Sequence, residues 1–430
     1  MLNADTLEYI INFLAGEQLP ANAVGYTSDA TQFCNYKLVI RPSDFFEKGI
    51  YGTEKSLPTL LTETLDSPPL LFGDSGSYVA ENTLIINADL IASTYFLISR
   101  YEEMVNPTRD QHGRFPATAS VLHKLNYLHK PLVDEYGQLL RDYLRKCGVE
   151  TAEPKQEISK IFLTHDVDKI SQYRNFRGFV GGILRGMKGL NFNATKTVFK
   201  SALSGIKHDP LYTFEWLFEQ NKRVSKAETI AFFKANHSPI SEDKPCYHLA
   251  STEVQNLFAL CRKNDVKIGL HASYLAGGNA SEIKSEKERL EKHSGKKIDC
   301  NRHHFLRTCS PFDMQYLISA GIQHDFTLGF ADCAGFRLGT CRAVRWINPQ
   351  STELTSLTLH PLTIMECSLD AYMSLSYEQA LQYCIDLIEQ VKKHNGELVL
   401  LWHNTSVAQW AENTQSYQRK LYEKLITHTS

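Results

Sequence analysis

Two patterns of apolar and polar residues divide the chain into two parts. In the first part, short apolar runs at 37–41 and 83–88 precede a segment, 88–104, whose apolar residues recur every three or four positions. That spacing is typical of a helix with one buried face, and the short runs favour strands. A second amphipathic helix is expected in "EYGQLLRDYLRKCGV". The first part is therefore predicted to be a small α+β domain.

The second part begins after a charged stretch, 150–160, whose few apolar residues predict a linker. Beyond it, short apolar runs predict strands at 161–164, 229–233, 266–270, 303–307, 325–329, 362–366 and 398–402. Amphipathic segments between them predict helices at 211–223, 252–264, 282–294, 312–320, 376–394 and 408–427. This alternation is typical of a parallel α/β sheet, either doubly wound or closed as a barrel. We expect domains at 1–152 and 158–430.

Composition narrows the class of protein. The formal net charge of -2 gives no overall field that would attract nucleic acid. The ten cysteines are scattered without a CxxC spacing, which favours free thiols. The first twenty residues lack the basic start of a signal peptide, and no apolar run approaches the length of a membrane span. We therefore expect a cytoplasmic protein.

Residues capable of chemistry follow several of the predicted strands. They are His165, Asp166 and Asp168 after the first strand, His271 after the third, Arg302, His303 and His304 around the fourth, and His403 after the last. Reactive groups collect at the carboxyl ends of parallel strands, so we expect some of these side chains to meet in one pocket. The structural alternative is that each is an ordinary capped or hydrogen-bonded residue. We prefer that alternative for His165, Ser273 and Tyr274 as far as chemistry is concerned.

A pocket that combines Asp and His side chains suits a divalent metal ion that prefers nitrogen and oxygen ligands, such as zinc. An ion with an open coordination position polarises a carbonyl oxygen and lowers the pKa of water. A neighbouring carboxylate can take the proton of that water, and an imidazole can give one to a leaving nitrogen. These are the parts needed to hydrolyse an amide.

The motifs "THDVD", "HASYL", "RHHFLR" and "LLWHN" resemble those of polysaccharide deacetylases of carbohydrate esterase family four. The resemblance implies that Asp166 is the general base, that Asp168 and His271 bind the metal, and that His403 is the general acid. Leu275 stands where the family usually has a second His, and His304 is the substitute we expect. Trp402 is expected to form a pocket wall.

A bacterial subgroup with an N-terminal domain of unknown function is more similar still. The shared segments include "ASTYFLISRYEE", "HGRFPA", "GLHASY" and "DFTLGFADCAGFRLGT". This resemblance implies a distorted seven-stranded (β/α) barrel behind the α+β domain. It also implies a zinc-dependent hydrolase that removes N-acetyl groups from a sugar or glycan precursor, with a link to surface-polysaccharide synthesis.

Further residues have two interpretations each. Arg302 is expected to orient Asp166 or contact substrate, and otherwise to form a surface salt bridge. Arg337 either grips the substrate or caps the core, and Tyr274 is a further candidate for substrate contact. The stretch 171–208 has seven Arg and Lys residues and no Asp or Glu, with apolar residues at helical spacing. It predicts peripheral contact with an anionic membrane, a grip on a diphosphate, or simply a packed helical insertion.

Two other classes of protein remain open on sequence. A glycosyltransferase can use a DxD motif to hold a metal and a nucleotide sugar, although this leaves His271, His304 and His403 unexplained. A metal-free sugar-binding barrel would explain Leu275. Nothing in the sequence sets the oligomeric state.

Overall fold

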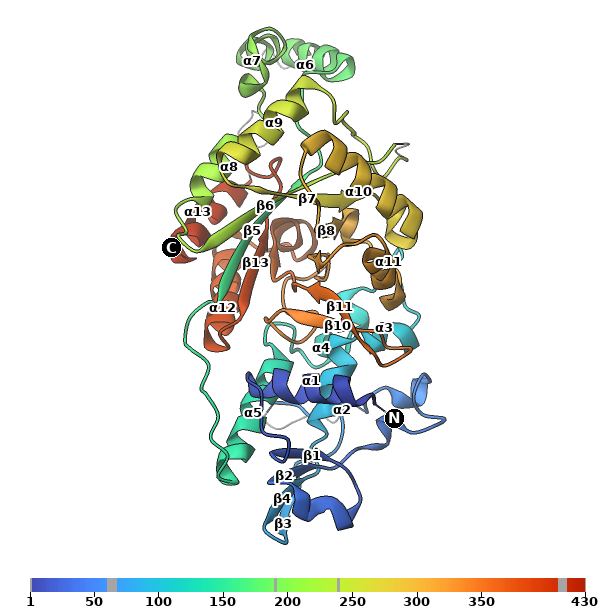
Figure 1. Ribbon diagram of the computed structural model, residues 1–430. Helices are drawn as coiled ribbons and strands as arrows, with labels where there is room; N and C mark the ends of the chain where they lie inside the picture. Colours follow the sequence, from blue (N-terminus) through green and yellow to red (C-terminus); the bar gives the residue numbers. More distant parts are fainter. Residues whose placement is uncertain (1, 60–67, 189–191, 238–239, 409–415, 430) are drawn as a thin grey trace.

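The computed structural model describes residues 2–59, 68–188, 192–237, 240–408 and 416–429. These residues form two sheets, one of four strands and one of nine. Figure 1 shows the smaller sheet at one end of the molecule and a pair of helices, α6 and α7, at the other end. The described residues contain no helix that is both long and apolar enough to cross a membrane.

The smaller sheet has the strand order β1-β2-β4-β3. Its strands are β1 (Val24–Tyr26), β2 (Leu38–Ile40), β3 (Ser77–Ala80) and β4 (Thr83–Ile86). The helices of this part are α1 (Ala4–Ala15), α2 (Leu90–Ile98), α3 (Tyr101–Val105), α4 (Val121–Lys124) and α5 (Leu132–Lys146). The expected mixture of strands and helices is present, and the division into domains at residue 152 stays a prediction.

The expected single helix at 88–104 is broken into α2 and α3. Arg100 lies between them with a positive φ of 63°, which a continuous helix does not allow. Its buried guanidinium donates hydrogen bonds to Glu103 and to Thr308, far along the chain. All of α2 is buried, and both helices face the same core. Apolar residues are therefore needed on both sides of the break, and their spacing in the sequence gives no sign of it.

The nine-stranded sheet has the order β10-β11-β9-β8-β7-β6-β5-β13-β12. Its strands are β5 (Lys160–Val167), β6 (Ala227–Phe233), β7 (Lys267–Ala272), β8 (Cys300–His303), β9 (His324–Asp325), β10 (Val344–Ile347), β11 (Leu354–Leu359), β12 (Ile364–Met365) and β13 (Glu397–Leu401). Neighbours are parallel except for the pair β10 and β11. No ladder joins β12 to β10 in the described part of the chain, so closure into a seven-stranded barrel stays a prediction.

Several expectations for this sheet need correction. The strand expected at 325–329 is only the two-residue β9, and the strand expected at 362–366 is only the two-residue β12. The strand expected at 303–307 ends at His303, because Phe305 and Leu306 take positive φ values of 62° and 51° and turn the chain. The antiparallel pair β10 and β11 was not predicted. The α/β class itself is confirmed by the mixed sheet and the helices around it.

The helices of the second part are α6 (Phe176–Lys188), α7 (Phe192–Ser204), α8 (Phe214–Asn221), α9 (Thr252–Lys263), α10 (Ala280–Ser294), α11 (Met314–Ser319), α12 (Tyr377–Lys393) and α13 (Gln418–Thr429). The expected helix at 408–427 is α13, which begins at Gln418; residues 409–415 lie outside the described part of the chain. Parallel register brings the carboxyl ends of β5, β6 and β7 to one edge of the sheet.

Candidate metal centre and acid–base site

Three of the predicted ligands meet at that edge. Asp168 follows β5, His271 lies near the end of β7, and His304 follows β8. The Oδ1 atom of Asp168 is 3.4 Å from Nε2 of His271 and 3.4 Å from Nε2 of His304. All three ligand atoms lie within 4.8 Å of one another. A tetrahedral ion with bonds of about 2.0–2.1 Å keeps its ligand atoms about 3.3 Å apart, so this spacing fits a zinc-like ion.

The second nitrogen of each imidazole is already held by the protein. Nδ1 of His271 lies 2.9 Å from the carbonyl oxygen of Arg302, and Nδ1 of His304 lies 2.9 Å from Oδ1 of Asp243. These contacts leave both Nε2 atoms with a lone pair facing Asp168, as in carboxylate–histidine–metal arrangements. Nε2 of His271 and Oδ1 of Asp168 are buried and have no hydrogen-bond partner in the described structure. Such atoms are costly unless they bind something, which also fits an ion.

The charges around the cluster favour a divalent cation. Four carboxylates lie here, and two side-chain cations and the protonated His403 accompany them, which leaves one negative charge when His271 and His304 are neutral. The carboxylates are Asp166, Asp168, Asp243 and Glu366, and the cations are Lys234 and Arg302. Burial alone would raise the pKa of Asp168, but its close contact with the imidazole of His271, with His304 and His403 nearby, lowers it well below its usual range. The site is therefore built to keep this carboxylate ionised.

Asp166 is held differently from Asp168. Its Oδ1 accepts a hydrogen bond of 3.2 Å from Nη1 of Arg302, which also donates to Thr164 Oγ1 at 2.7 Å. Arg302 is fully buried, so the expected orienting contact is present and the alternative of a surface salt bridge is not. The other oxygen, Oδ2, faces the cluster, 3.7 Å from Nε2 of His271 and 3.9 Å from Nε2 of His403. One oxygen of Asp166 is thus fixed while the second remains available for proton transfer.

His403 lies next to both Asp166 and Asp168. Nε2 is 3.6 Å from Asp168 Oδ2, and Nδ1 is 2.7 Å from Oε1 of Glu366. Glu366 is itself buried, and Ser406 donates a 2.6 Å hydrogen bond to the same oxygen. Burial would lower the pKa of His403, but the Glu366 carboxylate raises it well above its usual value. An imidazole held in this way keeps a proton on Nε2 that it can donate.

A second group of ligand types, Glu366, Cys367 and His403, is better explained as hydrogen bonding. The 2.7 Å between Glu366 and His403 is a short charge-assisted hydrogen bond and is below the spacing of two ligands on one ion. Burial also raises the pKa of the Cys367 thiol, which keeps it protonated. This group therefore positions His403.

Besides Glu366, three residues of the site were not predicted. Asp243 accepts hydrogen bonds from Tyr274 N and His304, and Lys234 at the end of β6 donates to the carbonyl oxygens of Asp243 and Pro245. Glu286 on α10 accepts from Ser273 N at 2.9 Å, and burial raises its pKa to about 7. Asp243 and Glu286 lie away from the strand ends, whereas Lys234 directly follows β6. The Lys that follows the apolar run 229–233 was the one available signal.

Several residues that were predicted for the site lie outside the ligand cluster. Trp402 is fully buried against Tyr422 of α13, whereas the next residue, His403, faces the site. Arg337 is buried and pairs with Glu103 at 2.8 Å, so it takes the core-capping position. Tyr274 lies at the rim, where Arg307 stacks over its ring at 4.4 Å. Leu275 is exposed and supplies no ligand.

His165 lies away from the ligand cluster. Its Nδ1 is 2.8 Å from the carbonyl oxygen of Trp402, and its Nε2 is 2.9 Å from the Asn221 amide nitrogen. Burial lowers its pKa to about 4. The structural interpretation that we preferred for this residue is confirmed.

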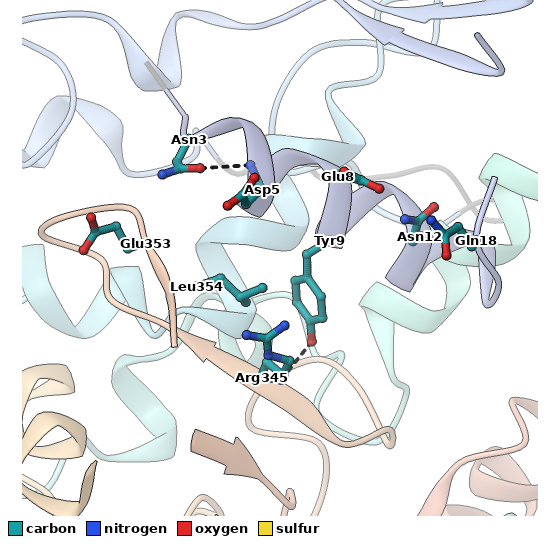
Figure 2. Close-up of a pocket in the computed structure, with 9 residues that line it drawn as sticks. All are labelled: Asn3, Asp5, Glu8, Tyr9, Asn12, Gln18, Arg345, Glu353 and Leu354. Atoms are coloured by element: carbon teal, nitrogen blue, oxygen red, sulfur yellow. Dashed lines mark hydrogen bonds between the residues drawn. The ribbon is translucent and has the colours of Figure 1, made fainter. Parts of the chain in front are cut away.

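A pocket of about 180 Å³ opens beside Asp168. Its walls come from the segments 168–175 and 245–253 and include Arg174, Tyr247 and Glu253. A separate hollow of about 530 Å³ lies between α1 and the strands β10 and β11, where Arg345 N donates to the Tyr9 hydroxyl (Figure 2). This hollow contains no His or Cys, and its lining residues share none with the ligand cluster.

Comparison of the chain with known proteins gives two matches. Residues 3–148 match the model of a family of unknown function, DUF7033. Among solved structures, the chain is similar to a candidate polysaccharide deacetylase from Mycobacterium smegmatis, with 11% sequence identity and a TM-score of 0.40. That match covers 65% of this chain and 86% of the other. No curated protein matches. The DUF7033 segment contains none of the ligand cluster, and membership of carbohydrate esterase family four stays a prediction.

Proposed function

We propose that the protein is a metal-dependent hydrolase that removes an N-acyl group, such as acetyl, from a sugar or glycan precursor. The observation that carries this proposal is the convergence of Asp168, His271 and His304, whose ligand atoms lie within 4.8 Å of one another, with both imidazoles 3.4 Å from Asp168. A carboxylate and a protonated imidazole, Asp166 and His403, lie beside this cluster. These are the groups that amide hydrolysis requires, and the resemblance of the motifs supplies the sugar as substrate class.

Each flanking residue has one task in this scheme. Oδ2 of Asp166 accepts the proton of the attacking water, while Arg302 keeps the carboxylate oriented through Oδ1. Nε2 of His403 donates a proton to the leaving nitrogen, and Glu366 holds the ring through Nδ1. Asp168, His271 and His304 would hold the ion, which when bound supplies Lewis-acid polarisation of the amide carbonyl.

Metal analysis and product analysis of the same protein test this function. The purified chain is expected to hold one zinc-like ion and to release acetate from N-acetylated amino sugars. Chelation should stop the release, and added zinc should restore it. His304→Ala is expected to lose both metal and activity, whereas the control His208→Ala, at an exposed histidine, should keep both.

The competing functions predict different outcomes of that experiment. A glycosyltransferase would hold metal but release no acetate, and it would consume a nucleotide sugar. A metal-free sugar-binding protein would hold no metal after reconstitution. Full metal occupancy in His304→Ala would remove His304 from the ligand set.

A further inference from the structure

The helices α6 and α7 form a hairpin with its own packed inner face. A Cβ on Gly182 would lie 2.7 Å from the side chain of Val198, and one on Gly186 would lie 2.2 Å from that of Thr195. These two glycines therefore allow α7 to approach α6 closely. Phe179 and Phe199 add an edge-to-face contact at 5.6 Å. The glycines that weaken the helical pattern in the sequence are thus explained by helix–helix packing.

The base of the hairpin is fixed to the rest of the protein. The buried carboxylate of Asp209 accepts hydrogen bonds from the backbone N–H groups of Gln172 and Tyr173 and from the Ser201 hydroxyl. Arg174 pairs with Glu253 at the start of α9. The hairpin therefore has a defined position, and Figure 1 shows it projecting past α9 at the end of the molecule opposite to the smaller sheet.

The outer surface of this hairpin is unusually apolar. Nine large apolar side chains are exposed in the described residues, and five of them belong to the hairpin: Phe176, Leu184, Met187, Phe199 and Leu203. Phe176 and Leu203 are 82% and 81% exposed. Single exposed apolar residues are ordinary, but a group of them on one projecting element indicates a contact surface.

The charged side chains of the hairpin are all basic. The stretch 171–208 contains no Asp or Glu, and Arg177, Lys188, Lys196 and Lys200 are exposed on it. A second copy of the chain would present the same positive surface and be repelled. Apolar side chains interspersed with cations instead match the boundary of an anionic bilayer, where the former enter the headgroup layer and the latter meet lipid phosphates.

We propose that the α6–α7 hairpin docks the protein on an anionic lipid bilayer. Arg174 and Asn175, at the base of the hairpin, line the same pocket as Asp168, so docking brings this pocket towards the lipid surface. A further step rests on the proposed hydrolase function: the substrate class is then an N-acylated sugar that is attached to a lipid.

Vesicle sedimentation tests the docking surface. The protein should sediment with phosphatidylcholine vesicles that contain phosphatidylglycerol, far less with pure phosphatidylcholine, and less in high salt. The triple variant Arg177→Gln, Lys196→Gln, Lys200→Gln should lower partitioning about 100-fold, and Phe176→Ser with Leu203→Ser should also weaken it. Matched controls outside the hairpin are Lys55→Gln, Lys284→Gln, Lys297→Gln for charge and Tyr78→Ser, Val79→Ser for apolar exposure.

The controls should bind as the wild type does, and all variants should keep its circular dichroism spectrum and metal content. Equal binding by hairpin variants and controls, or a wild type that ignores anionic vesicles at low salt, would overturn the docking proposal. For the substrate class, the hairpin variants should lose kcat/KM on a lipid-anchored N-acetyl sugar in vesicles but retain it on a water-soluble one. If the wild type hydrolyses neither, the proposed function fails while the sedimentation result still decides the docking surface.

Discussion

Asp166 and Asp168 are two positions apart at the end of one strand, yet they contact different partners. Arg302 holds Asp166, whereas His271 and His304 surround Asp168. Asp166→Asn keeps the shape of the side chain but removes its ability to accept a proton. We expect kcat to fall by a factor of about 10²–10⁴ while the metal content stays unchanged.

Asp168→Asn is the informative comparison for that variant, because it should lower metal content as well as rate. Metal analysis and steady-state kinetics on both variants distinguish the two roles. A near-normal kcat in Asp166→Asn would show that another group takes the proton.

Glu366 offers a second test of the site at the scale of one side chain. Its carboxylate is the charge that keeps a proton on His403, which it contacts at 2.7 Å. Glu366→Gln retains a partner for the ring but removes the charge, so kcat should fall while KM and metal content change little. Recovery of kcat in Glu366→Asp would support a positioning role. A raised KM and a lowered metal content in both Glu366→Gln and Glu366→Asp would instead indicate general damage to the site.

The residues that could be predicted are those that directly follow an apolar strand. Asp168, His271 and His403 were found in this way, since parallel strands end at one edge. Asp243 could not be found, because it comes from an irregular loop, whereas Glu366 ends the run 362–366 that was predicted as a strand but was not recognised as a site residue. Trp402 was expected at the pocket because it adjoins His403, but its ring packs against Tyr422 of α13.

At the scale of elements, the central strands β5, β6, β7 and β13 were predictable because each is a continuous apolar run buried by helices. The break between α2 and α3 was not, because it depends on the contact of Arg100 with Thr308, some two hundred residues away. The antiparallel pair β10 and β11 was also missed, since one residue of each strand is exposed and the apolar runs are interrupted. The local sequence pattern therefore predicted the continuous buried strands. It failed where contacts between residues far apart in the sequence determine where an element ends.

Glu102, in the first turn of α3, gives a prediction for that element. It is buried and accepts a 2.8 Å hydrogen bond from Val121 N at the start of α4. Burial raises its pKa from 4.5 to about 8, so the folded protein binds a proton there that the unfolded chain releases. The stability from this group is fully present below pH 4.5 and is lost as the pH rises through about 8.

Glu102→Gln should remove this dependence. Urea unfolding of both proteins across that pH range is the measurement. The variant should gain stability relative to the wild type as the pH rises, and a difference that is constant with pH would contradict the assigned pKa.

At the scale of the whole molecule, the N-terminal part contacts loops at the end of the large sheet through partly buried polar groups. Arg114 donates to the carbonyl oxygen of Phe305 at 2.9 Å, and His112 Nδ1 lies 3.3 Å from the hydroxyl of Tyr274 at the site rim. The sequence predicted a linker at 150–160 but gave no sign of these contacts, because each joins two loops. The N-terminal part thus supports the turn after His304, which holds a proposed ligand in place.

The buried pair of Glu103 and Arg337 is central to this contact and gives the last prediction. Burial would raise the pKa of Glu103, but the charges of Arg100 and Arg337 lower it to about 2. Its contribution to stability is therefore present above its ordinary pKa of 4.5 and is lost as the pH falls towards 2. Arg337→Met leaves this carboxylate with one buried partner fewer, which should cost about 3–5 kcal/mol of unfolding free energy at neutral pH.

Urea unfolding of Arg337→Met, Glu103→Met and the double variant measures that cost. Because the double variant leaves no uncompensated Glu103 charge, it should recover part of the loss. Folded Arg337→Met should keep the metal content and KM of the wild type, since its guanidinium contacts Glu103 and the carbonyl oxygen of Gly329 rather than the pocket beside Asp168. A raised KM with unchanged stability would instead return Arg337 to the substrate-binding role that the sequence left open.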